Sequence, residues 1–359
     1  MGLSSVAADL RETEIVAPNF KRRLSGVTST IVQLVPKQVA LGTRIVTLGP
    51  GLPAHLPKLG WSQLPGLWVR PRRYKVRVWH ARRNNEMLFG LLLRAVLRMP
   101  IKLLFTSAAQ RRHSAYTRFL IRRMHAVIAT STRSGSFLQV PHTVIQHGVD
   151  LNLFHPPEAP ADRMAATDLP GRYLIGCFGR VRHQKGTDLF VQAMIELLPN
   201  HPDWTAIVCG RVTPEHKAFA DGLTKAVADA GLSDRIRFLG EVDDIRPWYR
   251  RATLYVAPSR NEGFGLTPLE AMASQTAVVA SDAGAYAEMI VPGETGMVVP
   301  AGDGPALTAA IETYLADPDE ARRQGQNAVV HVRSNFALEK EATAIAAVYA
   351  GLLGEKRSS

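Results

Sequence analysis

Short apolar runs recur along this chain, and most of them end at Gly, Pro, Ser or a charged residue. Runs of this length with such ends are typical of buried strands. Segments with apolar residues at helical spacing separate many of them, and this alternation predicts parallel sheets with right-handed crossovers. The predicted strands are residues 14–18, 39–48, 76–79, 101–105, 125–130 and 143–146 in the first half, and 173–178, 206–210, 236–240, 254–257, 277–284 and 293–299 in the second.

Two helices are predicted in the first half from the spacing of apolar residues. Residues 87–99 are expected to form an amphipathic helix, and residues 111–124 a basic one. The apolar residues at helical spacing in the first are Leu88, Leu91, Leu92 and Val96. The residues of the second that are expected to face inward are Phe119, Leu120 and Met124.

A change of composition divides the chain. Residues 155–171 are rich in Pro, Ala and polar residues and have no periodicity, which is typical of a linker. A chain of 359 residues is long enough for two domains, each with its own core. We therefore predict an α/β protein with doubly wound domains at 1–165 and 166–335, followed by an amphipathic helix within 336–359.

Charge is distributed unevenly between the two halves. Residues 1–150 hold 23 Lys and Arg against 5 Asp and Glu, a balance of +18, and residues 151–359 hold 20 against 26, a balance of −6. A basic half suits nucleic acid, an anionic membrane or an acidic acceptor, unless it is only a solvated surface. Nucleic acid is disfavoured, because the chain has no zinc-finger spacing, RNP-like aromatic strand or heptad zipper.

The composition also indicates a compartment. The longest apolar run, near residues 88–93, falls far short of the roughly 20 residues that span a bilayer. The first 30 residues show no secretory apolar region. Cys177 and Cys209 both lie in strand-like runs and are expected to be buried thiols. We therefore expect a cytoplasmic protein.

The residues richest in candidate chemistry are 255–273, which predict a strand, a glycine-containing loop and a helix. Glycines let backbone N–H groups approach a ligand, and a helix N-terminus favours phosphate. A carboxylate would repel phosphate but accepts hydrogen bonds from sugar hydroxyls, so Glu262 and Glu270 favour a nucleotide sugar. Glu270 also fits a capping box with Thr267 as the N-cap. The remaining donor-binding candidates of this loop are Phe264, Gly265 and Leu266.

A second phosphate-binding constellation follows the strand at 173–178. Gly179, Arg180 and Lys185 precede a helix, and the pattern is neither a Walker motif nor a GxGxxG fingerprint. Arg offers bidentate contacts and Lys a point charge, so the pair suits a diphosphate. Two further strands end in glycine, and the ends of doubly wound strands form the ligand crevice. The candidates there for holding the base are Gly210, Arg211, Glu241 and Val242.

The segment Glu-Gly-Phe-Gly-Leu-Thr-Pro-Leu-Glu-Ala-Met-Ala resembles the signature of the family 4 retaining glycosyltransferases. This resemblance implies a GT-B fold, in which two Rossmann-like domains face each other across a cleft and the C-terminal helix packs back on the first. It implies that Arg180 and Lys185 bind the donor's diphosphate, Glu262 the transferred sugar and Glu270 the ribose. It also implies front-face attack with retention and no metal cofactor. Asp317-Pro-Asp319 is formally a DxD sequence, but it is predicted to break and cap a helix.

The first half provides the acceptor candidates. It also provides His80, which ends a predicted strand and is grouped with Arg180, Lys185 and Glu262 as a catalytic residue expected to orient the sugar, although a buried structural histidine is the alternative. The family's glycine-rich loop corresponds here to a single Gly26. The other acceptor-binding candidates are Arg22, Arg23, Ser25 and Arg82.

Residues 19–30, 78–84 and 106–111 resemble bacterial lipopolysaccharide core mannosyltransferases. That resemblance implies GDP-mannose as donor and an anionic glycolipid, such as a Kdo-containing core, reached from the inner face of the inner membrane. A UDP-glucose or UDP-galactose transferase, a nucleotide-sugar epimerase or hydrolase, and a non-catalytic binder remain alternatives. The residues give no oligomeric state.

Overall fold

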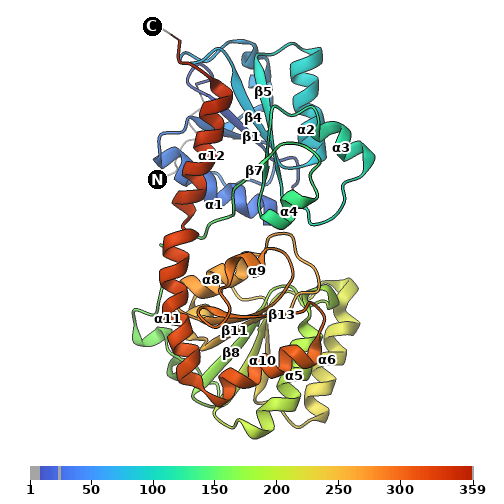
Figure 1. Ribbon diagram of the computed structural model, residues 1–359, viewed down its shortest axis with the longest axis vertical. Helices are drawn as coiled ribbons and strands as arrows, with labels where there is room; N and C mark the ends of the chain where they lie inside the picture. The colour runs from blue at the N-terminus through green and yellow to red at the C-terminus, as the bar shows by residue number, and fades with distance from the viewer. Residues whose placement is uncertain (1–8, 23–25, 358–359) are drawn as a thin grey trace. The chain divides into compact units, whose positions relative to one another are not determined.

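A computed structural model describes residues 9–22 and 26–357, and the chain forms two compact units (Figure 1). The first unit contains residues up to His147 together with residues from Leu338 onward, and the second contains Gly148–Ala337. Each unit is built on its own sheet, and every strand pair among the described residues is parallel. The predicted α/β class with doubly wound parallel sheets is therefore confirmed.

In the described part of the first unit, seven strands pair in the order β3-β2-β1-β4-β5-β6-β7. The prediction for residues 39–48 is wrong at its start, because the preceding helix continues to Ala40, and the short β3 was not predicted. The strands are β1 (Ile15–Pro18), β2 (Ile45–Leu48), β3 (Lys58–Leu59), β4 (Arg77–Ala81), β5 (Ile101–Ser107), β6 (Ala126–Ala129) and β7 (Thr143–Val144).

Helices cover both faces of this sheet because successive strand residues point to opposite sides. Ile15 packs with α1 (Gly26–Ala40) and α12 (Leu338–Leu353), whereas Val16 packs on the side of α2 (Asn84–Leu91) and α3 (Ala115–Ile121). Helix α12 contacts α1 and β4 and contributes Tyr349 to the core (Figure 1). The shorter helices are η1 (Trp61–Trp68), η2 (Leu92–Val96) and α4 (Thr132–Ser136).

The orientation of α2 differs from the predicted one. Met87, Gly90 and Leu93 face the sheet, while Leu88, Leu92 and Val96 of the predicted apolar stripe are exposed. The cause is Trp79 of β4, which lies fully buried beneath the helix: a Cβ on Gly90 would come within 2.7 Å of its indole. Phe119 of α3 is likewise exposed rather than inward, although Leu120 is buried and Met124 partly buried as predicted.

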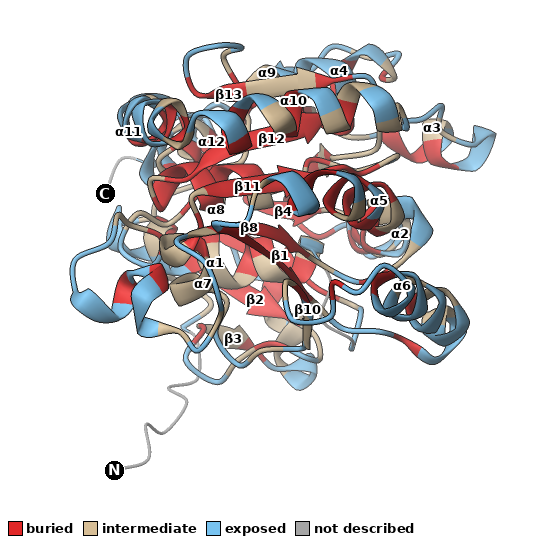
Figure 2. Ribbon diagram, turned by 90° about the horizontal axis from the view of Figure 1, so that it is seen from below, coloured by how far each residue is buried: buried red, intermediate tan, exposed pale blue. Residues whose placement is uncertain are grey.

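In the second unit, six strands of the described chain pair in the order β10-β9-β8-β11-β12-β13. The order reverses between β8 and β11, which is where open α/β sheets bind ligands. The four inner strands are almost wholly buried, whereas the two edge strands are partly exposed (Figure 2). They are β8 (Tyr173–Phe178), β9 (Trp204–Cys209), β10 (Ile236–Gly240), β11 (Leu254–Ala257), β12 (Ala277–Ser281) and β13 (Gly296–Val299).

Two sets of helices cover this second sheet. On one face lie α5 (Thr187–Leu197), α6 (Lys217–Asp229) and α10 (Gly304–Ala316). On the other lie α7 (Arg246–Arg251), α8 (Thr267–Ala273), α9 (Tyr286–Met289) and α11 (Pro318–Asn335). Asp317 caps α11 by accepting hydrogen bonds from the amides of Asp319 and Glu320, both at 3.1 Å, so the interpretation of the DxD sequence as a cap is confirmed.

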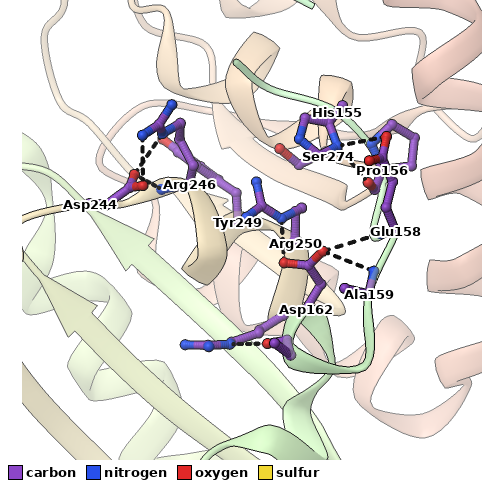
Figure 3. A network of polar contacts seen from close by, with 12 residues as sticks. His155, Pro156, Glu158, Ala159, Asp162, Asp244, Arg246, Tyr249, Arg250 and Ser274 are labelled. Atoms are coloured by element: carbon purple, nitrogen blue, oxygen red, sulfur yellow. Dashed lines mark hydrogen bonds and ion pairs between the residues drawn. The ribbon is translucent and has the colours of Figure 1, made fainter. Parts of the chain in front are cut away.

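The predicted boundary at residue 165 is wrong, because the supposed linker belongs to the second unit. Phe154 and Met164 are buried in its core, and Asp162 forms a 2.6 Å ion pair with Arg250 of α7. Asp162 also accepts hydrogen bonds from the amides of Glu158 and Ala159, which folds the segment into a tight turn (Figure 3). These contacts place the boundary between residues 147 and 148.

Candidate active site

The loop after β8 brings Lys185 to the edge of the second sheet. Gly179 ends the strand, a 3-10 turn spans His183–Lys185, and Gly186 adopts a left-handed conformation with φ of 69°. A Cβ at Gly186 would overlap the carbonyl oxygen of Pro258, which follows β11. The two loops lie so close together that only glycine fits there.

The loop after β11 supplies the partner of that lysine. Glu262 accepts a hydrogen bond from the Lys185 ammonium, which lies 77 positions away in the chain. Gly265 has a φ of 85° and lies directly against the Tyr286 ring, so that any Cβ would overlap the ring. Phe264 is buried beneath this loop.

Helix α8 begins without the predicted capping box. Leu266, whose side chain has no oxygen, is the N-cap, Thr267 is the first helical residue, and Pro268 follows it. The Glu270 carboxylate instead accepts a 2.8 Å hydrogen bond from the Tyr249 hydroxyl. Capping is therefore not the role of this side chain.

Glu270 is held close to the same lysine as Glu262. Burial raises the pKa of Glu270, and the hydrogen bond from Tyr249 and the positive charge of Lys185 oppose that rise. One ammonium thus lies near two carboxylates from the two ends of the signature segment. A carboxylate pair around a single cation is suited to a ligand that carries both anionic and hydroxyl groups.

A small hollow, with a cavity volume of about 10 Å³ and lined in part by Cys177 and Tyr255, lies between the loops after β8 and β11. Burial raises the pKa of the Cys177 thiol to about 12 and the pKa of the Tyr255 hydroxyl well above its usual value, so both are neutral and can only hydrogen-bond. The lining includes Gly179, Arg180, Lys185, Thr267 and Tyr286. Cys177 and Cys209 are both free and buried, as predicted.

The base-binding candidates lie at the ends of neighbouring strands. Gly210 fits so closely against the carbonyl oxygen of Gly179 that a Cβ would overlap it, and its amide donates to the carbonyl of Gly240 at 2.7 Å. The exposed side chains of Arg211 and Glu241 approach within 4.0 Å, and the neighbouring Val242 is partly buried. Strand order therefore brings these candidates to one edge of the sheet.

Arg180 differs from Lys185 in its surroundings. Its side chain is exposed, and no hydrogen bond or ion pair joins it to any residue that the structure describes. The guanidinium is therefore available to a ligand without first breaking an internal contact.

The candidates in the first unit have internal partners. His80 is fully buried, and its ring nitrogens lie 2.7 Å from the Tyr349 hydroxyl and 2.6 Å from the Thr106 hydroxyl. Burial, with the charge of Arg82, lowers the pKa of His80 well below its usual 6.5. A neutral imidazole with both ring nitrogens in hydrogen bonds is typical of a buried structural histidine.

The remaining acceptor candidates are placed only in part. Arg22 is exposed, Gly26 begins α1 and is exposed, and Arg23 and Ser25 fall outside the described residues. The amide of Arg82 donates to the Glu86 carboxylate at 2.7 Å.

Sequence reasoning missed three residues that organise these sites. Tyr249 orients Glu270, and Tyr286 supports Gly265, but neither lies in a motif. Glu86 is fully buried and binds Arg83 at 2.7 Å. Its signal was available, because it is the one acidic residue between Glu14 and Asp150 in the sequence.

A family model described as glycosyl transferases group 1 matches residues 162–330. The lipopolysaccharide core biosynthesis mannosyltransferase LpcC of Rhizobium leguminosarum bv. viciae is 75% identical over 350 residues, covering 98% of this chain and 99% of the relative. The chain belongs to the group 1 glycosyltransferases.

A second relative supports this membership, and a solved structure shares the fold. The glycosyltransferase is 54% identical over 348 residues to the lipopolysaccharide core biosynthesis mannosyltransferase LpsB of Rhizobium meliloti, covering 96% of this chain and 99% of the relative. The crystal structure of Anabaena HepE in complex with UDP matches with a TM-score of 0.81 and 19% identity, covering 95% of this chain and 100% of that one. That likeness shows a shared fold, and two parallel-sheet Rossmann-like units are those of the GT-B class.

Two features are absent from residues 9–22 and 26–357. Within these ranges, no helix of this glycosyltransferase is long and apolar enough to cross a bilayer. The same residues hold no group of three or more His, Cys, Asp or Glu side chains close enough together to bind a metal ion.

Proposed function

We propose that this glycosyltransferase transfers mannose from GDP-mannose to an anionic lipopolysaccharide core acceptor, with retention of configuration and without a metal. The observation that carries the proposal is the 75% identity along almost the whole chain to a lipopolysaccharide core mannosyltransferase. Identity at this level over both units includes the acceptor-binding half, which the signature segment alone does not inform.

The donor would bind at the second unit's pocket. Arg180 and Lys185 bind the diphosphate, and the charge that develops on the leaving phosphate is stabilised by these cations and by amides near Gly265. Glu270, oriented by Tyr249, binds the ribose hydroxyls. The base lies along Gly210, Arg211, Glu241 and Val242 at the ends of β9 and β10.

The Lys185–Glu262 ion pair suggests an exchange on donor binding. Without the donor, the charges of the Lys185 and Glu262 side chains neutralise each other. When the donor's diphosphate forms an ion pair with Lys185, the Glu262 carboxylate becomes available to accept hydrogen bonds from the hydroxyls of the transferred sugar. The departing phosphate then takes the acceptor's proton in a front-face attack.

The first unit would bind the acceptor through its positive charge. Arg22, Arg23, Ser25, Gly26 and Arg82 are the candidates, and an anionic glycolipid is complementary to a region with a balance of +18 in residues 1–150. His80 supports this site from within, by fixing α12 through Tyr349. The protein would act at the inner face of the bacterial inner membrane.

The test compares donors and then follows transfer. Thermal unfolding is measured with GDP-mannose, UDP-glucose and UDP-galactose, since the stabilisation grows with the logarithm of concentration over Kd. Transfer to a truncated core oligosaccharide is then followed with and without EDTA, and the anomeric configuration of the product is read by NMR. We expect a shift with GDP-mannose, an α-linked product and full activity in EDTA.

Other outcomes of these assays identify the alternatives. Stabilisation by a UDP sugar alone would replace mannose by glucose or galactose. Rapid loss of the donor without an acceptor would indicate a hydrolase or epimerase. Loss of activity in EDTA that Mg²⁺ restores would contradict the metal-independent mechanism.

A further inference from the structure

Helices α2, η2 and α3 of the first unit, with the residue directly after η2, present apolar side chains to solvent. The largest are Leu88, Leu92, Val96, Leu97, Tyr116 and Phe119, and together with the arginines described below they define the α2–α3 surface. We propose that this surface binds the face of a bilayer that contains anionic lipid. The inference extends the proposed function, because a glycolipid acceptor lies in a membrane.

The segment of α2 and η2 is apolar on two opposite sides. Met87, Gly90 and Leu93 face the sheet, as Trp79 requires, so Leu88, Leu92 and Val96 at intervals of four point outward with 49%, 44% and 66% of their surface exposed. A helix with a second apolar face is explained by a partner that covers it or by a membrane.

Helix α3 extends the same surface. It lies beside α2 (Figure 1), and the Asn84 amide donates to the Thr117 hydroxyl at 2.8 Å. Phe119 is 50% exposed, and the Arg123 guanidinium lies 3.4 Å from its ring centroid. A cation stacked on an exposed aromatic ring combines the two contacts that an anionic interface offers.

Two exposed tryptophans border α2. Trp68 donates from its indole to the carbonyl of Leu97 at 2.6 Å, and the Trp61 ring lies 6.1 Å from that of Phe89. Tryptophan is enriched at membrane–water interfaces because its indole is apolar with one polar group. Its position at this border fits a lipid surface.

The charge of the surface selects the lipid. Residues 87–149 contain nine Lys and Arg and no Asp or Glu. Arg94, Arg98, Arg112 and Arg122 form no ion pair with a carboxylate of the described residues. Arg112 and Arg122 also line a hollow beside α3. Such unpaired arginines attract anionic headgroups.

Other occupants fit less well. Nucleic acid would leave the leucine and valine stripe without a partner. A second copy in a two-fold dimer would place the same surface against itself. Arginines would then oppose arginines, with no carboxylate within residues 87–149 to neutralise them.

The experiment measures sedimentation of the full-length protein with vesicles at low salt. Vesicles of phosphatidylcholine mixed with phosphatidylglycerol are compared with vesicles of phosphatidylcholine alone. We expect binding to the mixed vesicles, weakened by salt. The variant Leu88→Gln/Leu92→Gln/Val96→Gln should bind at least about tenfold more weakly, because three apolar side chains no longer enter the interface.

A matched control tests whether the loss of vesicle binding is specific to this surface or follows from removing any exposed apolar side chain. Val330→Gln on α11 changes a valine that is 66% exposed, as is Val96, but lies in the other unit, and it should bind as the wild type does. Arg94→Gln/Arg122→Gln should lose affinity for the mixed vesicles by about fivefold per arginine. Because the substituted positions are exposed, the thermal unfolding of these variants should change little. Tryptophan fluorescence gives a second readout: the blue shift on adding vesicles should be smaller in Trp68→Phe.

The results distinguish this inference from the proposed function. A wild type that transfers mannose to the soluble core oligosaccharide but does not sediment with mixed vesicles overturns the docking surface and leaves the function standing. Equal binding by the triple variant and Val330→Gln also overturns it. Binding lost together with a change from dimer to monomer would assign the surface to self-association instead. Vesicle binding without any transfer would contradict the function and keep the surface.

Discussion

Arg180 and Lys185 serve the same proposed task from different surroundings, and this difference can be tested. Arg180 is exposed and has no partner among the described residues, whereas Lys185 forms an ion pair with Glu262 in which both side chains are about one-fifth exposed, at 21% and 19%. Replacing each by alanine should therefore affect transfer alike and stability differently.

The expected losses of turnover follow from transition-state charge. Removing one preorganised contact to a developing charge costs about 10²–10³ in rate. Arg180→Ala and Lys185→Ala should each show this loss, and the double variant a loss of at least about 10⁴, short of the product if the cations act as a unit. Initial rates of transfer at saturating acceptor measure it.

The expected losses of stability follow from burial. Arg180→Ala should change the free energy of unfolding by less than about 0.5 kcal/mol, as exposed substitutions usually do. Lys185→Ala leaves the largely buried Glu262 carboxylate without its cation, and we expect this to cost about 1–2 kcal/mol, between the values for exposed and fully buried ion pairs. In a unit of this size that corresponds to about 2–4 °C in Tm per kcal/mol. Circular dichroism measures it.

Two controls complete the experiment. Arg237→Ala removes an exposed arginine of β10 outside the pocket and should alter neither quantity. Combining Lys185→Ala with Glu262→Gln should restore stability but not turnover, because the unpaired charge is gone. Near-normal transfer by a well-folded Arg180→Ala variant would refute the assignment of this residue to the diphosphate. The assignment of Lys185 would be refuted if the loss of turnover in Lys185→Ala were no larger than its unfolded fraction explains.

Three further predictions concern single positions. Glu270→Gln should raise stability at neutral pH, because a carboxyl whose folded pKa is raised contributes stability that is lost as pH rises through that pKa. The same variant should weaken nucleotide binding. An unchanged Tm together with an unchanged nucleotide affinity would contradict both expectations. Gly186→Ala should cost at least about 2 kcal/mol, combining a left-handed conformation with overlap of the Pro258 carbonyl, and urea unfolding measures it; wild-type stability would show that the two loops separate freely. Because the pKa of His80 is lowered on folding, the stability that this group contributes is present above its unfolded pKa of 6.5 and falls as the pH drops below that value. His80→Gln should therefore flatten this part of the curve of urea midpoint against pH. An unchanged slope would show that another group titrates there.

Local patterns were sufficient for much of this fold. Apolar runs such as residues 173–178 and 254–257 predicted their strands because burial on both faces leaves an uninterrupted apolar sequence. The glycines and cations at the ends of those strands predicted the candidate site, since parallel strands bring their carboxyl ends to one edge. The boundary near residue 165 failed because Pro and Ala in residues 155–171 resemble a linker, while Asp162 and Arg250, 88 positions apart, pin the segment to α7.

The sequence alone determined most of the strands, where loops with glycine and charge follow them, and how charge divides between the halves, because these depend on neighbours along the chain. Tertiary structure alone decided that Lys185 pairs with Glu262, that Tyr249 orients Glu270, and that Trp79 and Gly90 turn the leucine stripe of α2 outward. Those outcomes depend on contacts between distant segments. Spacing along the chain fixes the period of a helix but not the direction that its apolar side chains face.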